Sequence, residues 1–363
     1  MARFIVVGGG LLGMLTAREL AVDSNQVILI EKHEMAREST WAGGGILSPL
    51  YPWRYPDSIT NLATWSQRNY TEICDDLRLS TGIDPEYSPR GMLVIAPDEI
   101  TAALDWADRH AKNLELIAQD KIRSLEPALV SPPNNAIWMS DIAHVRNPRL
   151  ARALVEDLQQ RGVSLLLKQP VTGLYILNNS VSGVKTSDGV LEADAVVVCA
   201  GAWTGQLLNG VTPPPAIHPV RGQMLLFKTE PDVIKRIVLE KNRYIIPRID
   251  GRVLFGSTLE ETGFDKQTTH AAREELYTIA TERFPVLKKY PIEKHWAGLR
   301  PSSPAGVPYI TAHPELPGLY INAGHFRNGV VLGPASAHLC ADLVLGREPL
   351  LAPAPYSLHA TRE

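Results

Sequence analysis

Residues 4–32 read FIVVGGGLLGMLTARELAVDSNQVILIEK, and this stretch decides the fold. Its first four residues are apolar and mostly β-branched, which is typical of a buried parallel strand. Glycines with G-x-G-x-x-G spacing follow at Gly8, Gly10 and Gly13, and the next residues have helical periodicity. A second strand-like run then carries Glu31, eighteen residues after Gly13. Strand, glycine loop, helix, strand and acid in this order predict a Rossmann-type dinucleotide site.

This stretch contains a candidate residue for each chemical role in a dinucleotide-binding site. Gly8 would make the tight turn, Gly10 would let the backbone approach a pyrophosphate, and Gly13 would let the helix pack on the strand. The helix N-terminus would meet the phosphate charge. Glu31 would bind ribose hydroxyls, and its negative charge disfavours a ribose 2′-phosphate.

A second glycine-rich loop follows at 38–49, which reads ESTWAGGGILSP. It offers Ser39 and Thr40 and then three successive glycines from Gly43 to Gly45. Such a loop allows backbone N–H groups to line a flat or charged ligand. The alternative is a flexible glycine linker without a binding role.

Composition and charge narrow the class of protein. The chain has 363 residues, enough for two domains, with 45% apolar and 21% charged residues and a net charge of −3. The small negative charge and the lack of a long basic run argue against nucleic acid as a partner. Three scattered cysteines are too few for a disulfide framework or a metal cluster. Without a membrane-length apolar run or a secretory leader, we expect a soluble cytoplasmic protein.

The rest of the sequence alternates between α/β segments and two mainly antiparallel stretches. Asn147 followed by Pro148 predicts the cap and first residue of a helix, Asp98 predicts the cap of another, and Asp250 with Gly251 predicts a hairpin. Strands are expected at 92–97, 163–168, 171–177, 181–186, 192–203, 221–227, 243–259 and 319–325, and helices at 98–112, 147–160, 268–284 and 328–346.

Residues 295–301, HWAGLRP, place Arg300 in an apolar setting. A buried guanidinium is costly unless a negative group meets it. No acidic residue lies between Glu293 and Glu315. Either a distant carboxylate pairs with Arg300, or its partner is not part of the protein.

Seven segments together resemble the FAD-dependent D-amino-acid oxidase superfamily. The resemblance spans nearly the whole chain, and the last two segments are the most specific. The segments are GGGLLG, IEK, STWAGGGILSP, CAGAW, YIIPR, HWAGLRP and AGHFRNG.

The resemblance implies an α/β fold with a discontinuous Rossmann-type FAD-binding domain and an inserted, mainly antiparallel α+β substrate domain. The FAD-binding domain would comprise residues 1–85, 141–218 and 296–363. The substrate-binding domain would comprise residues 86–140 and 219–295. No cysteine lies at an obvious flavin-linking position, so noncovalent FAD is expected.

The resemblance also implies FAD contacts at matching positions. Val171 would lie near the adenine, and the free N–H groups of the helix that opens after Asn328 would face the negative charge of the reduced flavin. The expected cofactor-binding residues are Gly8, Gly10, Leu11, Leu12, Gly13, Glu31, Lys32, Ser39, Thr40, Gly44, Gly45, Ile46, Val171, His325, Phe326, Arg327, Asn328, Gly329, Val330 and Val331.

Three residues are implied to bind the substrate carboxylate: Arg300, Tyr244 and Arg327. The planar fork of Arg300 suits a carboxylate. The alternatives are a core ion pair for Arg300, a packed sheet tyrosine for Tyr244 and a surface loop arginine for Arg327. Tyr51 and Trp53 could form a lid, although ordinary aromatic packing explains them as well.

The implied activity is oxidative deamination of glycine, sarcosine or a small D-amino acid. Hydride would pass to flavin N5, and no side chain would act as catalytic acid or base. The products would be an oxo acid such as glyoxylate, ammonia and, through dioxygen, hydrogen peroxide, serving thiazole formation in thiamine biosynthesis. No metal is expected. The resemblance also implies a homotetramer.

Three other functions stay open at this point. The first is an oxidase of sarcosine or another N-alkyl amino acid, which differs only in pocket size. The second is a D-amino-acid dehydrogenase that passes electrons to a quinone, for which membrane contact would be needed and no apolar anchor is visible. The third is a flavin-binding protein without turnover.

Overall fold

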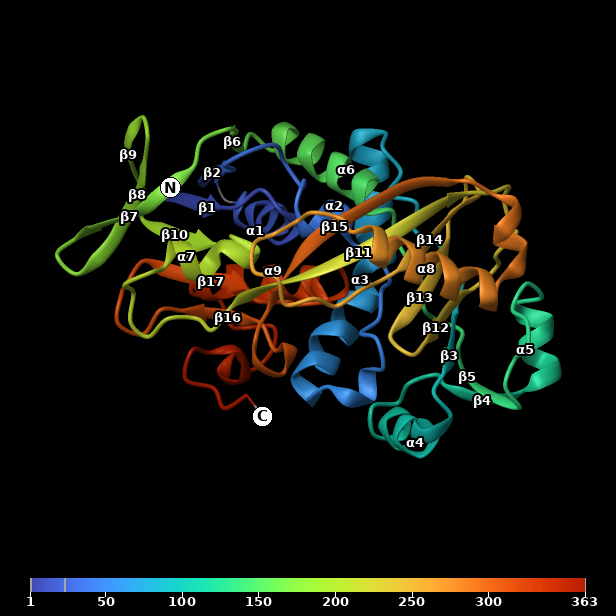
Figure 1. Ribbon diagram of the computed structural model, residues 1–363. Helices are drawn as coiled ribbons and strands as arrows, with labels where there is room; N and C mark the ends of the chain where they lie inside the picture. Colours follow the sequence, from blue (N-terminus) through green and yellow to red (C-terminus); the bar gives the residue numbers. More distant parts are fainter. Residues whose placement is uncertain (1, 23, 363) are drawn as a thin grey trace.

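Three β-sheets of six, eight and three strands organise the chain. The structure is a computed structural model, and it describes residues 2–22 and 24–362. The six-stranded sheet and its helices occupy one side of the molecule, and the eight-stranded sheet occupies the other (Figure 1).

The six-stranded sheet has the order β16-β17-β10-β1-β2-β6. Its pairs are parallel except for the antiparallel pair β16–β17. The residues of β10 are all buried, as expected for a strand covered on both faces. The strands are β1 (Arg3–Val7), β2 (Gln26–Ile30), β6 (Ser164–Leu166), β10 (Ala195–Val198), β16 (Tyr309–Ala312) and β17 (Leu319–Ala323).

Helices cover one face of this sheet, and the three-stranded sheet covers the other. Val181 and Val184 of the small sheet pack against Ile5 and Val196. The small sheet projects from the edge of the molecule in Figure 1. It contains β7 (Val171–Leu177), β8 (Ser180–Thr186) and β9 (Gly189–Glu192), and the covering helices are α1 (Leu11–Leu20), α3 (Asp57–Thr81), α6 (Asn147–Gln160) and α9 (Gly329–Leu345).

The eight-stranded sheet has the order β15-β11-β14-β13-β12-β3-β5-β4 and is antiparallel except for the pair β3–β12. Strand alternation gives it two apolar faces: Leu93 lies in the cluster that includes α8, whereas Met92 and Val94 lie in the cluster that includes α4. The elements are β3 (Met92–Ile95), β4 (Glu115–Ala118), β5 (Asn135–Met139), β11 (His218–Lys228), β12 (Ile237–Glu240), β13 (Arg243–Pro247), β14 (Arg252–Gly256), β15 (Ile292–Ser302), α4 (Ile100–Arg109), α5 (Gln119–Leu125) and α8 (His270–Arg283).

Short helices connect these elements. They are α2 (Ser39–Ala42), α7 (Thr204–Leu207) and the 3-10 turns η1 (Pro52–Arg54), η2 (Pro97–Glu99), η3 (Gly201–Trp203), η4 (Pro285–Lys289), η5 (Pro304–Gly306) and η6 (Ala354–Tyr356). A parallel sheet flanked by helices and a second, mainly antiparallel sheet confirm the expected fold class. β15 crosses the expected domain boundary at residue 296 and belongs to the eight-stranded sheet, and the exact division into domains stays a prediction.

Two expected helix caps are wrong. Asn147 is the first residue of α6 instead of its cap, and its side-chain Nδ2 donates to the carbonyl oxygen of Thr40 at 2.8 Å. Asp98 lies inside the 3-10 turn η2, and α4 begins after Glu99 without a side-chain cap. The side chain of Asn147 bonds to Thr40 instead of capping its own helix, and Asp98 is part of a separate turn. The local sequence does not reveal either feature.

The helix α3, which spans 25 residues, was not predicted from the sequence. Its buried side chains include Ile59, Leu62, Tyr70 and Leu77, a helical spacing that could have identified it. The helix ends at Gly82, which has a left-handed φ of 70°. Because α3 packs against α6 and α9, it supports the helical layer under the first sheet.

The glycine loop between β1 and α1 depends on close backbone packing. Gly8 has φ +113°, and a Cβ at this position would lie 2.5 Å from the carbonyl oxygen of Cys199, which directly follows β10. A Cβ on Gly13 would lie 1.8 Å from the carbonyl oxygen of Gly8. The missing side chain of Gly13 therefore lets α1 approach the loop.

We predict that Gly13→Ala destabilises the protein, because the added methyl group overlaps backbone that cannot yield as a side chain would. The expected cost is about 1–3 kcal/mol, as for other overpacked interiors. It should appear as a lower thermal unfolding midpoint by circular dichroism of the FAD-free protein.

Gly173→Ala is the matched control, because a Cβ on Gly173 would meet nothing within 4 Å. It should change stability by no more than about 0.5 kcal/mol. An equal loss in the two variants, or none in Gly13→Ala, would contradict the proposed packing.

Candidate active site

Two adjoining cavities lie where the sheets meet. The sheet-edge cavity, of about 310 Å³, opens at the carboxyl ends of β1, β2, β10 and β17, where open α/β sheets bind ligands. The arginine cavity, of about 120 Å³, lies between this edge and the eight-stranded sheet and takes its name from Arg300. Six residues line both: Leu11, Leu12, Ser39, Thr40, Pro301 and His325.

Most of the expected site residues line these cavities, and three do not. The sheet-edge cavity contains Gly8, Gly10, Leu11, Leu12, Glu31, Lys32, Ser39, Thr40, Val171 and His325. The arginine cavity contains Gly44, Gly45, Ile46, Tyr244, Arg300, Phe326, Arg327, Gly329 and Val330, together with residues of the first group. Gly13, Asn328 and Val331 line neither cavity: Gly13 packs under the glycine loop, and Val331 belongs to the core.

Glu31 directly follows β2, and its carboxylate is hydrogen-bonded to the backbone of the glycine loop. Its Oε2 accepts a hydrogen bond from the backbone N–H of Gly9 at 2.8 Å, and its Oε1 accepts one from the N–H of His33 at 2.9 Å. Two backbone donors thus fix the carboxylate at the wall of the sheet-edge cavity. Each oxygen keeps a further lone pair for a ligand.

Lys32 packs its ammonium group on the ring of Trp203, with Nζ 3.4 Å from the ring centroid. Burial lowers the pKa of Lys32, while the nearby charges of Glu38 and Glu31 act in the opposite direction. Trp203 and Gln206 also line the sheet-edge cavity, although neither was among the expected site residues. The turn after β10, CAGAW, contains Trp203 and was the available signal.

The second glycine loop forms the floor between the two cavities. The hydroxyl of Thr40 accepts a hydrogen bond from the N–H of Leu11 at 2.9 Å, which ties this loop to the start of α1. Gly45 has φ +79°, and a Cβ on Gly44 would meet Ile246 at 2.7 Å. Within residues 2–22 and 24–362, neither Gly44 nor Gly45 donates its N–H to a protein acceptor. The loop therefore presents free donors and no side chains.

Arg300 lies in β15, with its guanidinium held by neutral oxygens. Nη1 donates to the carbonyl oxygens of Arg221 and Thr258 at 3.3 and 3.2 Å, and Nη2 donates to Ser257 Oγ at 2.5 Å. The group lies on Gly222, where a Cβ would be 2.0 Å from Nη2. Burial lowers the pKa of Arg300, so its charge is kept at a free-energy cost.

No carboxylate of the described residues forms an ion pair with Arg300. Glu260 is the acid whose charge favours the protonated arginine, but its Oε2 accepts from Arg221 Nη2 at 2.6 Å. Its Oε1 accepts from Gln223 at 2.9 Å and from the hydroxyl of Thr258. The distant-carboxylate explanation thus finds no support, and the charge of Arg300 faces the arginine cavity.

Tyr244 lies on β13 of the same sheet, and its hydroxyl is close enough to Arg300 to oppose the lowering of the arginine's pKa. Its hydroxyl contacts Met224 Sδ at 3.7 Å, a weak acceptor, and both residues line the cavity. A phenol with no stronger partner can donate to a ligand oxygen. Met224 and Gly222 were not among the expected site residues, although both lie in the antiparallel run 221–227.

The segment after β17 contributes further unsatisfied polar atoms. Asn328 is 2% exposed, and neither its Oδ1 nor its Nδ2 has a hydrogen-bond partner among the described residues. Arg327, which lines the arginine cavity, has a buried Nη2 without a partner in the same part of the chain. An unpaired buried polar group costs about 1–3 kcal/mol, so a polar ligand that paired with these atoms would remove that cost.

His325 is a neutral hydrogen-bonding residue and not an acid–base catalyst at neutral pH. Its Nε2 lies 2.6 Å from Ser336 Oγ, and Ser336 donates to Asn322 Oδ1 at 2.7 Å. Since Ser336 uses its proton there, Nε2 of His325 must be the donor to Ser336. Burial lowers the pKa of His325 to about 3.

Tyr51 and Trp53 pack in the interior. Tyr51 is buried, and the two ring centroids lie 5.8 Å apart in an edge-on arrangement. Trp53 Nε1 donates to Glu99 at 2.7 Å. Neither residue lines the arginine cavity, which favours aromatic packing over a lid.

The two cavities fit FAD. The sheet-edge cavity offers a glycine loop, a helix N-terminus and a fixed carboxylate for the adenosine diphosphate part. The arginine cavity offers the free N–H groups of Gly44 and Gly45, and the orphaned atoms of Asn328 lie nearby. No cluster of three or more metal-ligating side chains occurs in the described part of the chain. Nor does any described helix have the length and apolar character needed to cross a membrane.

Known proteins share both the sequence and the fold. A glycine oxidase of Pseudomonas aeruginosa is 47% identical over 98% of each chain. A bifunctional ThiO/ThiG protein of Nostoc is 30% identical over 97% of this chain and 54% of its own length. The crystal structure of glycine oxidase from Geobacillus kaustophilus superposes with a TM-score of 0.92 at 28% identity, covering 100% of each chain. Residues 3–343 match the family model described as FAD dependent oxidoreductase, DAO. The chain therefore belongs to the DAO family of FAD-dependent oxidoreductases.

Proposed function

We propose that this chain is a glycine oxidase that converts glycine, dioxygen and water into glyoxylate, ammonia and hydrogen peroxide. The observation that carries the proposal is the half-buried guanidinium of Arg300, which faces a small cavity without a carboxylate partner among the described residues. An amino-acid carboxylate supplies the missing charge. The glycine oxidases at 47% and 28% identity support the same activity.

The substrate would be oriented by its carboxylate. Arg300 offers a planar fork, and the hydroxyl of Tyr244 offers a second donor at the same cavity. Arg327 adds a buried Nη2 without a partner at the same cavity. These contacts would direct the α-carbon toward the glycine loop.

FAD would be held by the glycine loop, Glu31 and the second loop. When bound, FAD supplies the oxidising chemistry, accepting two electrons from the substrate and passing them to dioxygen. The protein needs no side chain that removes the α-proton, provided that the amine is neutral. His325, with a pKa of about 3, is neutral at pH 7 and does not act as an acid. The chain's contribution is orientation and electrostatics.

The biological setting follows from the relatives and from the resemblance. A relative that carries ThiO joined to ThiG supports a role for the product in thiazole formation for thiamine. We also propose a cytoplasmic homotetramer, as the family resemblance implies.

The first test of the function is peroxide release. The purified protein should be yellow and should release FAD upon denaturation, because the cavities bind this cofactor. It should also produce peroxide when glycine is added. Sarcosine and small D-amino acids should be compared in the same assay, since a preference for either would favour the alternative oxidases. Reduction of a quinone analogue without peroxide would favour a dehydrogenase. No turnover with any of these substrates in flavin-saturated protein would refute the proposal.

Arg300→Ala should lower kcat/KM for glycine strongly, because the substrate carboxylate loses its charged partner in a buried site. The expected loss is about 2–5 kcal/mol, or roughly thirty-fold to several-thousand-fold in rate. Arg300→Lys should recover only part, since a point charge lacks the fork. The measurement is steady-state peroxide release together with the affinity for glycolate, a carboxylate competitor.

Three comparisons complete this test. Arg273→Ala on α8 removes a surface arginine whose ion pair among the described residues is with Glu274, and it should behave as wild type. Gly222→Ala should displace the guanidinium without removing it, and its activity should fall as well. Amines without a carboxylate should be little affected in Arg300→Ala. Wild-type kcat/KM for glycine in Arg300→Ala would show that this arginine has only a structural role.

Glu31→Ala should weaken FAD binding, because the carboxylate accepts charge-assisted hydrogen bonds from ribose hydroxyls. The expected loss is on the order of 1.5–3 kcal/mol. It should be measured as the dissociation constant of FAD from the apoprotein, and excess FAD should restore most turnover. Glu34→Ala is the control, since Glu34 is exposed and pairs with Arg37. Equal FAD affinity in the Glu31 and Glu34 variants would exclude a role of Glu31 in binding.

A further inference from the structure

A buried arginine, Arg248, lies behind the second glycine loop. It follows β13 and is 4% exposed. Its Nη2 donates to the carbonyl oxygen of Gly44 at 2.8 Å, and its Nη1 donates to the carbonyl oxygen of Val145 at 2.9 Å. Nη1 also lies 2.9 Å from Nδ1 of His144. The guanidinium thus ties the loop to the strand-like segment before α6.

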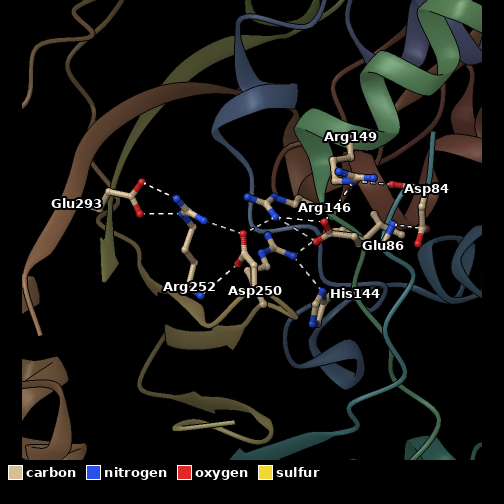
Figure 2. A network of polar contacts seen from close by, with 10 residues as sticks. Asp84, Glu86, His144, Arg146, Arg149, Asp250, Arg252 and Glu293 are labelled. Carbon is tan, nitrogen blue, oxygen red and sulfur yellow. Dashed lines mark hydrogen bonds and ion pairs between the residues drawn. The ribbon is translucent and has the colours of Figure 1, made fainter. Parts of the chain in front are cut away.

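The charge of Arg248 has no ion-pair partner among the residues described. The nearby acids are already engaged, as Figure 2 shows: Arg146 contacts Glu86 at 3.2 Å and Asp250 at 2.8 Å. Asp250 is also paired with Arg252. Burial lowers the pKa of Arg248 to about 10, which still leaves the side chain protonated at neutral pH.

His144 cannot share this charge. Its Nδ1 faces a guanidinium that can only donate, so Nδ1 is the acceptor and the ring proton lies on Nε2. Burial and the charge of Arg248 lower the pKa of His144 well below its ordinary value. The histidine therefore stays neutral, and the arginine contributes a net positive charge behind the loop.

The bond to Gly44 also sets the direction of a peptide group. In a trans peptide the C=O and the following N–H point in opposite directions. With the carbonyl of Gly44 turned toward Arg248, the N–H of Gly45 points away from Arg248. Gly44 and Gly45 line the arginine cavity, and the N–H of Gly45 has no acceptor within the described ranges.

We propose that Arg248 is a positioning residue for the flavin. It holds the Gly44 carbonyl back so that the Gly45 N–H is available to the isoalloxazine ring, and its charge stabilises the reduced, negatively charged ring. The inference rests on the proposed function in one respect: it requires the ring to lie against Gly44 and Gly45. Both FAD affinity and the midpoint potential of the bound flavin should then depend on this arginine.

The test compares Arg248→Met with Arg248→Lys in FAD-saturated protein and in apoprotein. Arg248→Met should weaken FAD binding about tenfold or more, as expected for loss of hydrogen bonds from a charged donor. It should also shift the midpoint potential to more negative values and lower kcat while leaving KM for glycine nearly unchanged. Arg248→Lys keeps the charge without the fork, so FAD should still bind more weakly while the potential stays close to wild type.

Arg252→Met is the matched control, because Arg252 pairs with Asp250 and Glu293 and makes no contact with the glycine loop. It should leave FAD affinity and potential unchanged. If Arg248→Met is insoluble, Arg248→Gln, which removes the charge and retains a donor, takes its place.

Two results would overturn the proposal. The first is wild-type FAD affinity in the charge-removing variant. The second is an equal fall in potential in that variant and in Arg248→Lys. Failure of the proposed function itself would be seen separately, as wild-type protein that binds FAD but does not oxidise glycine.

Discussion

The half-buried guanidinium of Arg300 is the constraint on which the site depends. Removing a cation from water is costly, and among the described residues Arg300 donates only to neutral oxygens, those of Arg221, Thr258 and Ser257. Those oxygens can be reached only because Gly222 leaves room for the guanidinium. Glu260, the acid that could neutralise it, is held by Arg221 and Gln223. The surrounding strands thus keep a positive charge available for a ligand.

The position of that charge follows from the way in which the two sheets meet. β15 is the edge strand of the eight-stranded sheet, and its last residues reach the cavity at the carboxyl ends of the parallel strands. Thr40 and Asn147 tie the second glycine loop to α1 and α6, so the floor between the cavities belongs to both halves of the molecule. A nucleotide and a small acid can therefore share one continuous site.

Sequence patterns could predict the parallel sheet and the glycine loop, because strand periodicity and G-x-G-x-x-G spacing are local properties. They could also raise the question of Arg300, since the absence of nearby acids is visible in the sequence. They could not reveal that Glu260 is paired with Arg221. That contact depends on an antiparallel bridge that brings Glu260 beside Arg221 of β11, and the bridge joins residues far apart in the sequence. The missed role of Gly222 has the same origin: its space is set by a side chain from the neighbouring strand.

Arg300 and Arg248 both keep a positive charge without an ion-pair partner among the described residues, but they direct their hydrogen bonds at different parts of the site. Arg300 points its donors at neutral oxygens on the wall of a cavity, whereas Arg248 directs its donors at the backbone of the loop that separates that cavity from the back of the sheet. In each case the acids that could neutralise the cation are bound to another arginine, Arg221 or Arg146. Because these acids neutralise Arg221 and Arg146, the positive charges of Arg300 and Arg248 remain on the two sides of the second glycine loop. Negative charge that develops between them is stabilised without any side chain having to move.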